Sequence, residues 1–188
     1  MNLPNKLTLS RVIAIPIFIV LFVLGTLNKT TGYDVINIYR AMAAAIFVVA
    51  SITDYFDGKI ARERNLITNF GKLMDPLADK MIVVTAMILL TESKEIHYLC
   101  TLVVVLRELT ISSIRLIALE KGIVIAASIW GKLKTATQMV SIVLILFNFY
   151  KINELAFYLT YGLFYISTIF VIISLIDYIV KSKEVFLS

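Results

Sequence analysis

The chain has 188 residues, enough for one domain, and 60% of them are hydrophobic while only 16% carry a charge. With a mean hydropathy of +0.90, an ordinary soluble protein is excluded, because a globule of this size cannot bury so much apolar surface. The net charge of +5 indicates anionic lipid headgroups and phosphorylated substrates as partners, and no nucleic acid. We therefore expect an all-α, polytopic membrane protein with a single domain over residues 1–188.

Six apolar stretches approach the length of about 20 residues with which a helix crosses a bilayer. They predict six transmembrane helices, with a short N-terminal interfacial helix from Leu3 ahead of the first. The second should continue as a helix past the bilayer edge to Asp57. The third should begin at Asp75 and Pro76, because Asp is a good N-cap and Pro a good first helical residue. The expected ranges are 12–27, 35–51, 75–90, 98–119, 129–149 and 155–180.

Lysine and arginine residues set the orientation, because cytoplasmic segments carry an excess of them. If the N-terminus is cytoplasmic, the outside keeps only Lys29, Arg40, Lys94 and Lys151. The cytoplasmic side then collects Lys6, Arg11, Lys59, Arg62, Arg64, Lys72, Lys80, Lys121, Lys132, Lys134, Lys181 and Lys183. This asymmetry predicts a multi-pass protein of the cell membrane, with both termini and the acidic cluster described next in the cytoplasm.

Four carboxylates lie between the second and third apolar stretches. Asp54 and Asp57 are three residues apart, and Asp75 and Asp79 are four apart, so on helices the two carboxylates of each pair point the same way. Charge at membrane depth costs about 2.5 to 3.5 kcal/mol per residue, which makes such residues functional by default. Like charges so close require a cation, and hard carboxylate oxygens suit Mg²⁺, Mn²⁺ or Ca²⁺. The spacing therefore predicts a divalent-metal site, with room for two ions.

A second group of charged residues is basic. Arg107 and Arg115 lie eight residues apart, close to one face of a helix, in an otherwise apolar span. Arginine at this depth must face protein or water, and Glu108 beside it can pair with a neighbouring cation. Lys132 and Lys134 begin the fifth span on the same side. Arginine offers paired donors to a phosphate and lysine a point charge, so these residues predict a phosphate pocket. A positive-inside flank explains the lysines alone equally well.

The acidic residues belong to a longer pattern, Asp-x2-Asp-Gly-x2-Ala-Arg-x8-Gly-x3-Asp-x3-Asp. Its eight fixed positions are Asp54, Asp57, Gly58, Ala61, Arg62, Gly71, Asp75 and Asp79. This pattern resembles the signature of the CDP-alcohol phosphotransferases, with no departure at any fixed position. Members of that family are integral membrane enzymes that use a divalent metal to displace CMP from a CDP-linked alcohol with a second alcohol.

The resemblance implies a role for each of these residues. Asp54, Asp57 and Asp75 would be the main ligands of Mg²⁺ or Mn²⁺, with two ions bound. Asp79 would be the catalytic general base that takes the proton of the acceptor hydroxyl, and it would also contact the second metal. Small residues let the nucleotide approach the helix closely. The residues expected to bind the nucleotide are Gly58, Ala61, Arg62, Gly71, Asn5 and Thr8.

Two further segments narrow the resemblance. Residues 2–11 and 130–138 are similar to the branch of the family that joins CDP-diacylglycerol to sn-glycerol 3-phosphate. The products of that branch are phosphatidylglycerophosphate and CMP, in phospholipid biosynthesis. The acceptor phosphate would be bound by Arg107, Arg115, Lys132 and Lys134. We also expect a homodimer in contact with membrane lipids.

Two alternatives stay open. The first alternative is another acceptor within the same family, either inositol phosphate or, as in a cardiolipin synthase, phosphatidylglycerol. Neutral serine fits the basic residues less well. From a different class, a metal-ion transporter also gathers carboxylates inside a membrane. A transporter would distribute the acids along a path through the bilayer, whereas these four acids lie at one edge.

Overall fold

The computed structural model describes the backbone at residues 3–27, 37–63, 69–121 and 128–182. Side chains are described within these ranges except at 3–8, 54–63, 69–79 and 119. The described chain is helical throughout, which confirms the all-α prediction with its six long helices. These are α1 (Leu3–Leu27), α2 (Ile38–Glu63), α3 (Asn69–Glu92), α4 (Tyr98–Glu120), α5 (Ile129–Leu146) and α6 (Glu154–Lys181), with a short 3-10 turn, η1 (Phe149–Lys151), between the last two.

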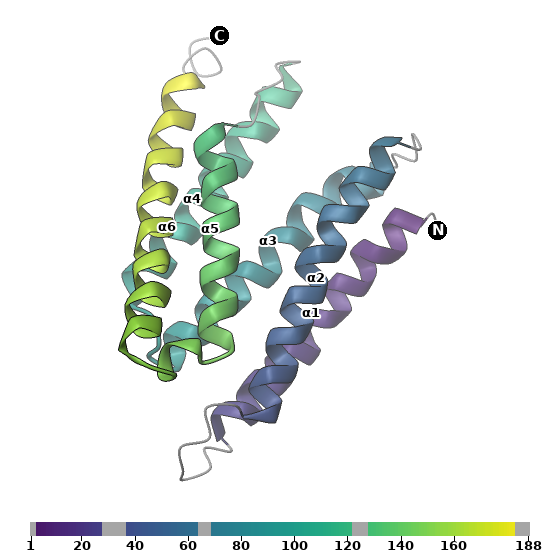
Figure 1. The fold of residues 1–188 in the computed structure, drawn as a ribbon. Helices are drawn as coiled ribbons and strands as arrows, with labels where there is room; N and C mark the ends of the chain where they lie inside the picture. The colour runs from purple at the N-terminus through teal and green to yellow at the C-terminus, as the bar shows by residue number, and fades with distance from the viewer. Residues whose placement is uncertain (1–2, 28–36, 64–68, 122–127, 183–188) are drawn as a thin grey trace.

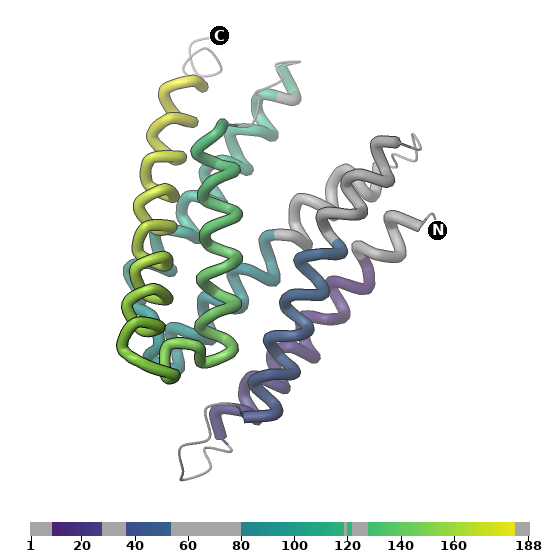
Figure 2. The backbone as a smooth tube through the Cα atoms, viewed as in Figure 1, coloured from purple at the N-terminus to yellow at the C-terminus, as the bar shows by residue number. Residues whose placement is uncertain are grey.

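The helices run up and down through one bundle (Figure 1). α1 lies along α2, and α5 lies along α6. α4 packs against α6. α3 crosses between these two groups and contacts helices of both, as the path of the tube in Figure 2 shows. Because the direction alternates from helix to helix, the start of α5 and the end of α6 lie at the same end of the bundle.

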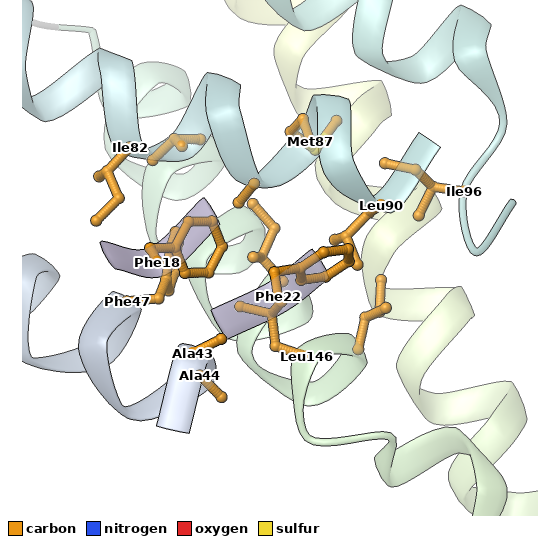
Figure 3. Close-up of a cluster of buried hydrophobic side chains, with 14 of the residues drawn as sticks. Phe18, Phe22, Ala43, Ala44, Phe47, Ile82, Met87, Leu90, Ile96 and Leu146 are labelled. Carbon is orange, nitrogen blue, oxygen red and sulfur yellow. The ribbon is translucent and has the colours of Figure 1, made fainter. Parts of the chain in front are cut away.

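One apolar core joins all six helices. The ring of Phe18 on α1 lies 6.2 Å from the ring of Phe22 and 6.2 Å from that of Phe47 on α2, measured between centroids. Ala43 and Ala44 are fully buried on the α2 face toward these rings (Figure 3). Small residues let helix backbones approach closely, and in a lipid environment such packing is a main source of helix association. The core therefore fixes how α1, α2 and α3 lie against one another.

The outer surface of the bundle is apolar. Large aliphatic side chains such as Val20, Ile88, Leu109 and Leu159 are exposed on successive helices. Such a surface is incompatible with water and compatible with lipid tails. Three of the described segments are long and apolar enough to cross a bilayer, namely Leu9–Leu27, Ile129–Leu146 and Glu154–Lys181, and Ile38–Thr53 is a shorter apolar helix.

Three predicted boundaries were wrong. The interfacial helix expected from Leu3 is not a separate element, because α1 is continuous from that residue. α3 begins at Asn69, ahead of the expected start at Asp75. The N-cap preference of Asp75 is worth only about 1 kcal/mol, and a transmembrane helix tolerates a proline such as Pro76 in its interior. α5 ends at Leu146 and not at 149, because Asn148 adopts the left-handed conformation, with φ of 55°, that terminates helices.

Candidate active site

A cavity of about 610 Å³ lies between α3, α4, α5 and α6. It is formed by the C-terminal half of α4, the start of α5 and the end of α6, so it lies toward the end of the bundle at which α5 begins. Apolar residues such as Val83, Ile111 and Met139 form part of its wall. Its charged residues, among those described, are Lys80, Arg107, Glu108, Arg115, Lys132 and Lys134.

The carboxylate of Glu108 is the centre of the charged wall. Its Oε1 accepts hydrogen bonds from Lys134 Nζ at 2.6 Å and from Arg107 Nη1 at 2.7 Å. Its Oε2 lies 3.5 Å from Lys80 Nζ, and that ammonium group also donates to the hydroxyl of Ser112. The side chains of Glu108 and Lys134 are buried, with 9% and 6% exposed. One carboxylate thus links cations from α3, α4 and α5.

Two further contacts join this wall to α6. Arg107 Nη2 donates to Ser174 Oγ at 2.7 Å, and Arg115 Nε donates to the hydroxyl of Tyr178 at 3.2 Å. The guanidinium of Arg115 also lies over the ring of Tyr178, 5.8 Å from its centroid. Because Ser174 and Tyr178 are one helical turn apart, α6 orients both arginines from a single face.

The start of α5 places its two lysines differently. Ser128 is the N-cap, and its Oγ accepts a hydrogen bond from the backbone of Trp130 at 3.3 Å. Lys134 lies six residues after Ser128 and is buried against Glu108, whereas Lys132 is exposed at the rim of the cavity. Residues two apart on a helix point to nearly opposite sides. Only one of the two lysines can therefore lie deep in the wall.

The structure brings together the four basic residues expected at an acceptor phosphate, since Arg107, Arg115, Lys132 and Lys134 all line this cavity. The expected pairing of Glu108 with a neighbouring cation is also confirmed. Sequence reasoning did not place Lys80, Ser174 and Tyr178 in this wall. The charge of Lys80 directly after Asp79 could have identified that residue. Ser174 and Tyr178 could have been identified as two polar groups one turn apart on an apolar helix.

The acidic motif falls on the two helices that its spacing requires. α2 runs through Asp54 and Asp57, and α3 runs through Asp75 and Asp79. The side chains of these aspartates lie outside the described residues, as do those of Gly58, Ala61, Arg62, Gly71, Asn5 and Thr8. Within the described residues, no group of three or more histidine, cysteine or acidic side chains could hold a metal. As a donor set, four carboxylates suit a hard divalent cation.

The acidic motif and the cavity are connected through α3. Lys80, which lines the cavity, directly follows Asp79 in the same helix. Adjacent residues on a helix are separated by a rise of about 1.5 Å along the axis, so the backbone of Asp79 lies one such step from the backbone of Lys80.

Known proteins resemble the chain over most of its length. The family model for CDP-alcohol phosphatidyltransferases matches residues 1–179. A Bacillus subtilis protein is 35% identical over 97% of this chain and 96% of its own length. A Shigella flexneri protein is 36% identical over 97% and 95%, and a Rickettsia typhi protein 40% identical over 73% and 72%. All three bear the name CDP-diacylglycerol–glycerol-3-phosphate 3-phosphatidyltransferase. The protein therefore belongs to the CDP-alcohol phosphatidyltransferase family.

Proposed function

We propose that this protein is a phosphatidylglycerophosphate synthase of phospholipid biosynthesis. It transfers the phosphatidyl group of CDP-diacylglycerol to sn-glycerol 3-phosphate. The hydroxyl oxygen of the acceptor forms a bond to the lipid-bearing phosphorus, and the bond from that phosphorus to CMP breaks. The products are phosphatidylglycerophosphate and CMP. The names of the relatives and the charge of the cavity both support this reaction.

The observation that carries the proposal is the excess of positive charge in the cavity wall. Five basic side chains line the cavity with one carboxylate among the described residues. Lys134 is buried against Glu108 and Arg107 nearly so, whereas Lys132 and Arg115 are exposed. One carboxylate can neutralise only one of these five positive charges, and buried cations are costly unless they are paired. A phosphorylated acceptor brings about two negative charges near neutral pH, and arginine and lysine are the side chains that bind such a group. An uncharged acceptor would leave the excess uncompensated.

The chemical step is assigned to the acidic motif. We propose that Asp54, Asp57 and Asp75 hold Mg²⁺ or Mn²⁺, with two ions in the complete site. When bound, these ions would neutralise charge on the pyrophosphate. Asp79 accepts the proton of the acceptor hydroxyl. Its place on α3 directly before Lys80 supports this role, because Lys80 lines the cavity proposed for the acceptor.

The remaining proposals concern the surroundings of the site. Gly58, Ala61, Arg62, Gly71, Asn5 and Thr8 are proposed to contact the nucleotide. Both termini and the cavity face the cytoplasm, which the distribution of lysine and arginine supports. We also propose a homodimer, which chemical crosslinking in membranes would test.

Replacing Arg107 by Gln or Lys134 by Ala tests the acceptor site. Each change should raise the apparent KM for glycerol 3-phosphate about ten- to a hundredfold, because a charge-assisted contact is worth about 1.5 to 3 kcal/mol. The KM for CDP-diacylglycerol should change far less. The measurement is CMP release as each substrate is varied in turn.

Lys181→Gln is the matched control, because it also removes one positive charge near this end of the bundle. Lys181 pairs with Asp177 at 2.9 Å, with 58% of its side chain exposed, away from the cavity wall. It should keep the native KM for both substrates. If Arg107→Gln and Lys134→Ala behave like this control, the basic residues are only a positive-inside flank.

A further inference from the structure

Glu108 is the one acidic side chain among the described residues that line the cavity. It is buried, with 9% of the side chain exposed. A buried carboxylate close to the place of an anionic substrate opposes binding by Coulomb repulsion, and it does so more strongly than it would in water. On charge alone, the cavity would bind a phosphate better without it. Its presence therefore requires another physical reason.

The contacts of the carboxylate supply that reason. Oε1 fixes Lys134 Nζ at 2.6 Å and Arg107 Nη1 at 2.7 Å, and Oε2 lies 3.5 Å from Lys80 Nζ. These three like charges would repel one another if no anion lay between them. Their side chains are long and lose much rotamer entropy when they are fixed. A wall that is fixed before the substrate arrives spares the substrate this cost.

We propose that Glu108 is a positioning residue for the acceptor, acting through Lys134 and Arg107. The inference rests on the proposed function, because it takes the cavity as the site of the acceptor phosphate. An ammonium group and a guanidinium each have more N–H donors than their contacts with Glu108 use. Arg107 is held a second time by Ser174 Oγ at 2.7 Å. The phosphate binds to the donors that remain, while Glu108 stays in place behind the cations.

Two substitutions of Glu108 separate positioning from charge. Glu108→Gln keeps the shape of the side chain and makes the cavity more positive by one charge. Glu108→Asp keeps the charge and withdraws the carboxylate by one methylene group. If the cavity attracted phosphate by net charge alone, Glu108→Gln would lower the KM for glycerol 3-phosphate and Glu108→Asp would leave it unchanged.

Positioning predicts the opposite sign. Glu108→Gln should raise the KM for glycerol 3-phosphate about tenfold, because the amide does not hold the two cations as the carboxylate does. Glu108→Asp should raise it by a smaller factor, and the KM for CDP-diacylglycerol should stay close to native in both variants. Protection of the purified protein from heat by glycerol 3-phosphate gives a second readout that needs no turnover, and both variants should lose part of it.

Glu120→Gln is the control, since Glu120 is exposed near the end of the same helix and is not part of the cavity wall. It should keep the native KM for glycerol 3-phosphate. If Glu108→Gln does not fold, Glu108→Asp carries the test. The native protein is measured first. If it releases no CMP with glycerol 3-phosphate, the proposed function is overturned. Native activity together with an unchanged or lowered KM in the Glu108 variants would overturn the positioning role alone.

Discussion

Two buried ion clusters lie at different levels of the bundle, and their surroundings differ. Arg40 binds Glu95 with both nitrogens, at 2.6 and 2.7 Å, and its guanidinium lies over the ring of Phe22, 4.5 Å from the centroid. This paired geometry satisfies both charges without a ligand. The cluster around Glu108 instead lines a cavity and leaves cations in excess. We therefore interpret the first cluster as structural and the second as a binding site.

A substitution at Gly25 tests the packing of α1 against the Arg40–Glu95 ion pair. A Cβ atom at this position would lie 2.7 Å from Arg40 Cγ and 3.0 Å from the backbone nitrogen of Arg40, and the ion pair with Glu95 prevents that side chain from moving away. Gly25→Ala should therefore destabilise the protein by about 1 to 3 kcal/mol through overpacking. The measurement is the thermal unfolding of the purified protein in detergent.

Gly162→Ala provides the comparison, because a Cβ atom there would meet nothing within 4 Å. Alanine is favoured over glycine within a helix by about 1 kcal/mol, so this variant should be at least as stable as the native protein. Equal unfolding temperatures for the two alanine variants would show that α1 and α2 do not approach each other as closely as described.

At the scale of elements, α2 and α3 carry two aspartates each, and we assign different roles to Asp57 on α2 and Asp79 on α3. Asp57→Asn should abolish turnover while the protein stays folded, because one metal ligand is lost without a change of shape.

Asp79→Asn should lower kcat by about a hundred- to ten-thousandfold while CDP-diacylglycerol still binds with metal present. CMP release and nucleotide binding are measured on the same preparations. Substantial activity of Asp57→Asn at saturating Mg²⁺ or Mn²⁺ would contradict the ligand role. Loss of metal and nucleotide binding together in Asp79→Asn would instead make that residue primarily a metal ligand.

The sequence predicted where the helices lie along the chain better than it predicted which residues of different helices contact one another. The starts expected at Tyr98 and Ile129 agree with α4 and α5, because a long apolar run has a clear beginning. Arg107 and Lys134 were found as site residues because charge inside an apolar span is costly. Ser174 and Tyr178 were not found, since their contacts with Arg107 and Arg115 join residues 67 and 63 positions apart. Local patterns cannot show which face of α6 meets α4.

The whole molecule combines a lipid-facing exterior with a charged cavity toward one end. Exposed aliphatic residues cover the outside of the bundle, while Lys134, Arg107 and Arg115 line the cavity. These three cations are held by Glu108, Ser174 and Tyr178. This arrangement suits a reaction between a lipid and a water-soluble anion, because each substrate meets the surface that it prefers. The apolar tails can stay in the bilayer while the phosphate of the acceptor enters the cavity.

The choice of acceptor tests this account most directly. The purified protein would be incubated with CDP-diacylglycerol and Mg²⁺ or Mn²⁺, and CMP release would be measured with glycerol 3-phosphate, glycerol, serine, inositol phosphate and phosphatidylglycerol in separate reactions. The account predicts rapid release with glycerol 3-phosphate, formation of phosphatidylglycerophosphate, and little release with glycerol or serine, which lack the phosphate that the cations bind. Equal release with uncharged glycerol, or the fastest release with phosphatidylglycerol, would contradict it.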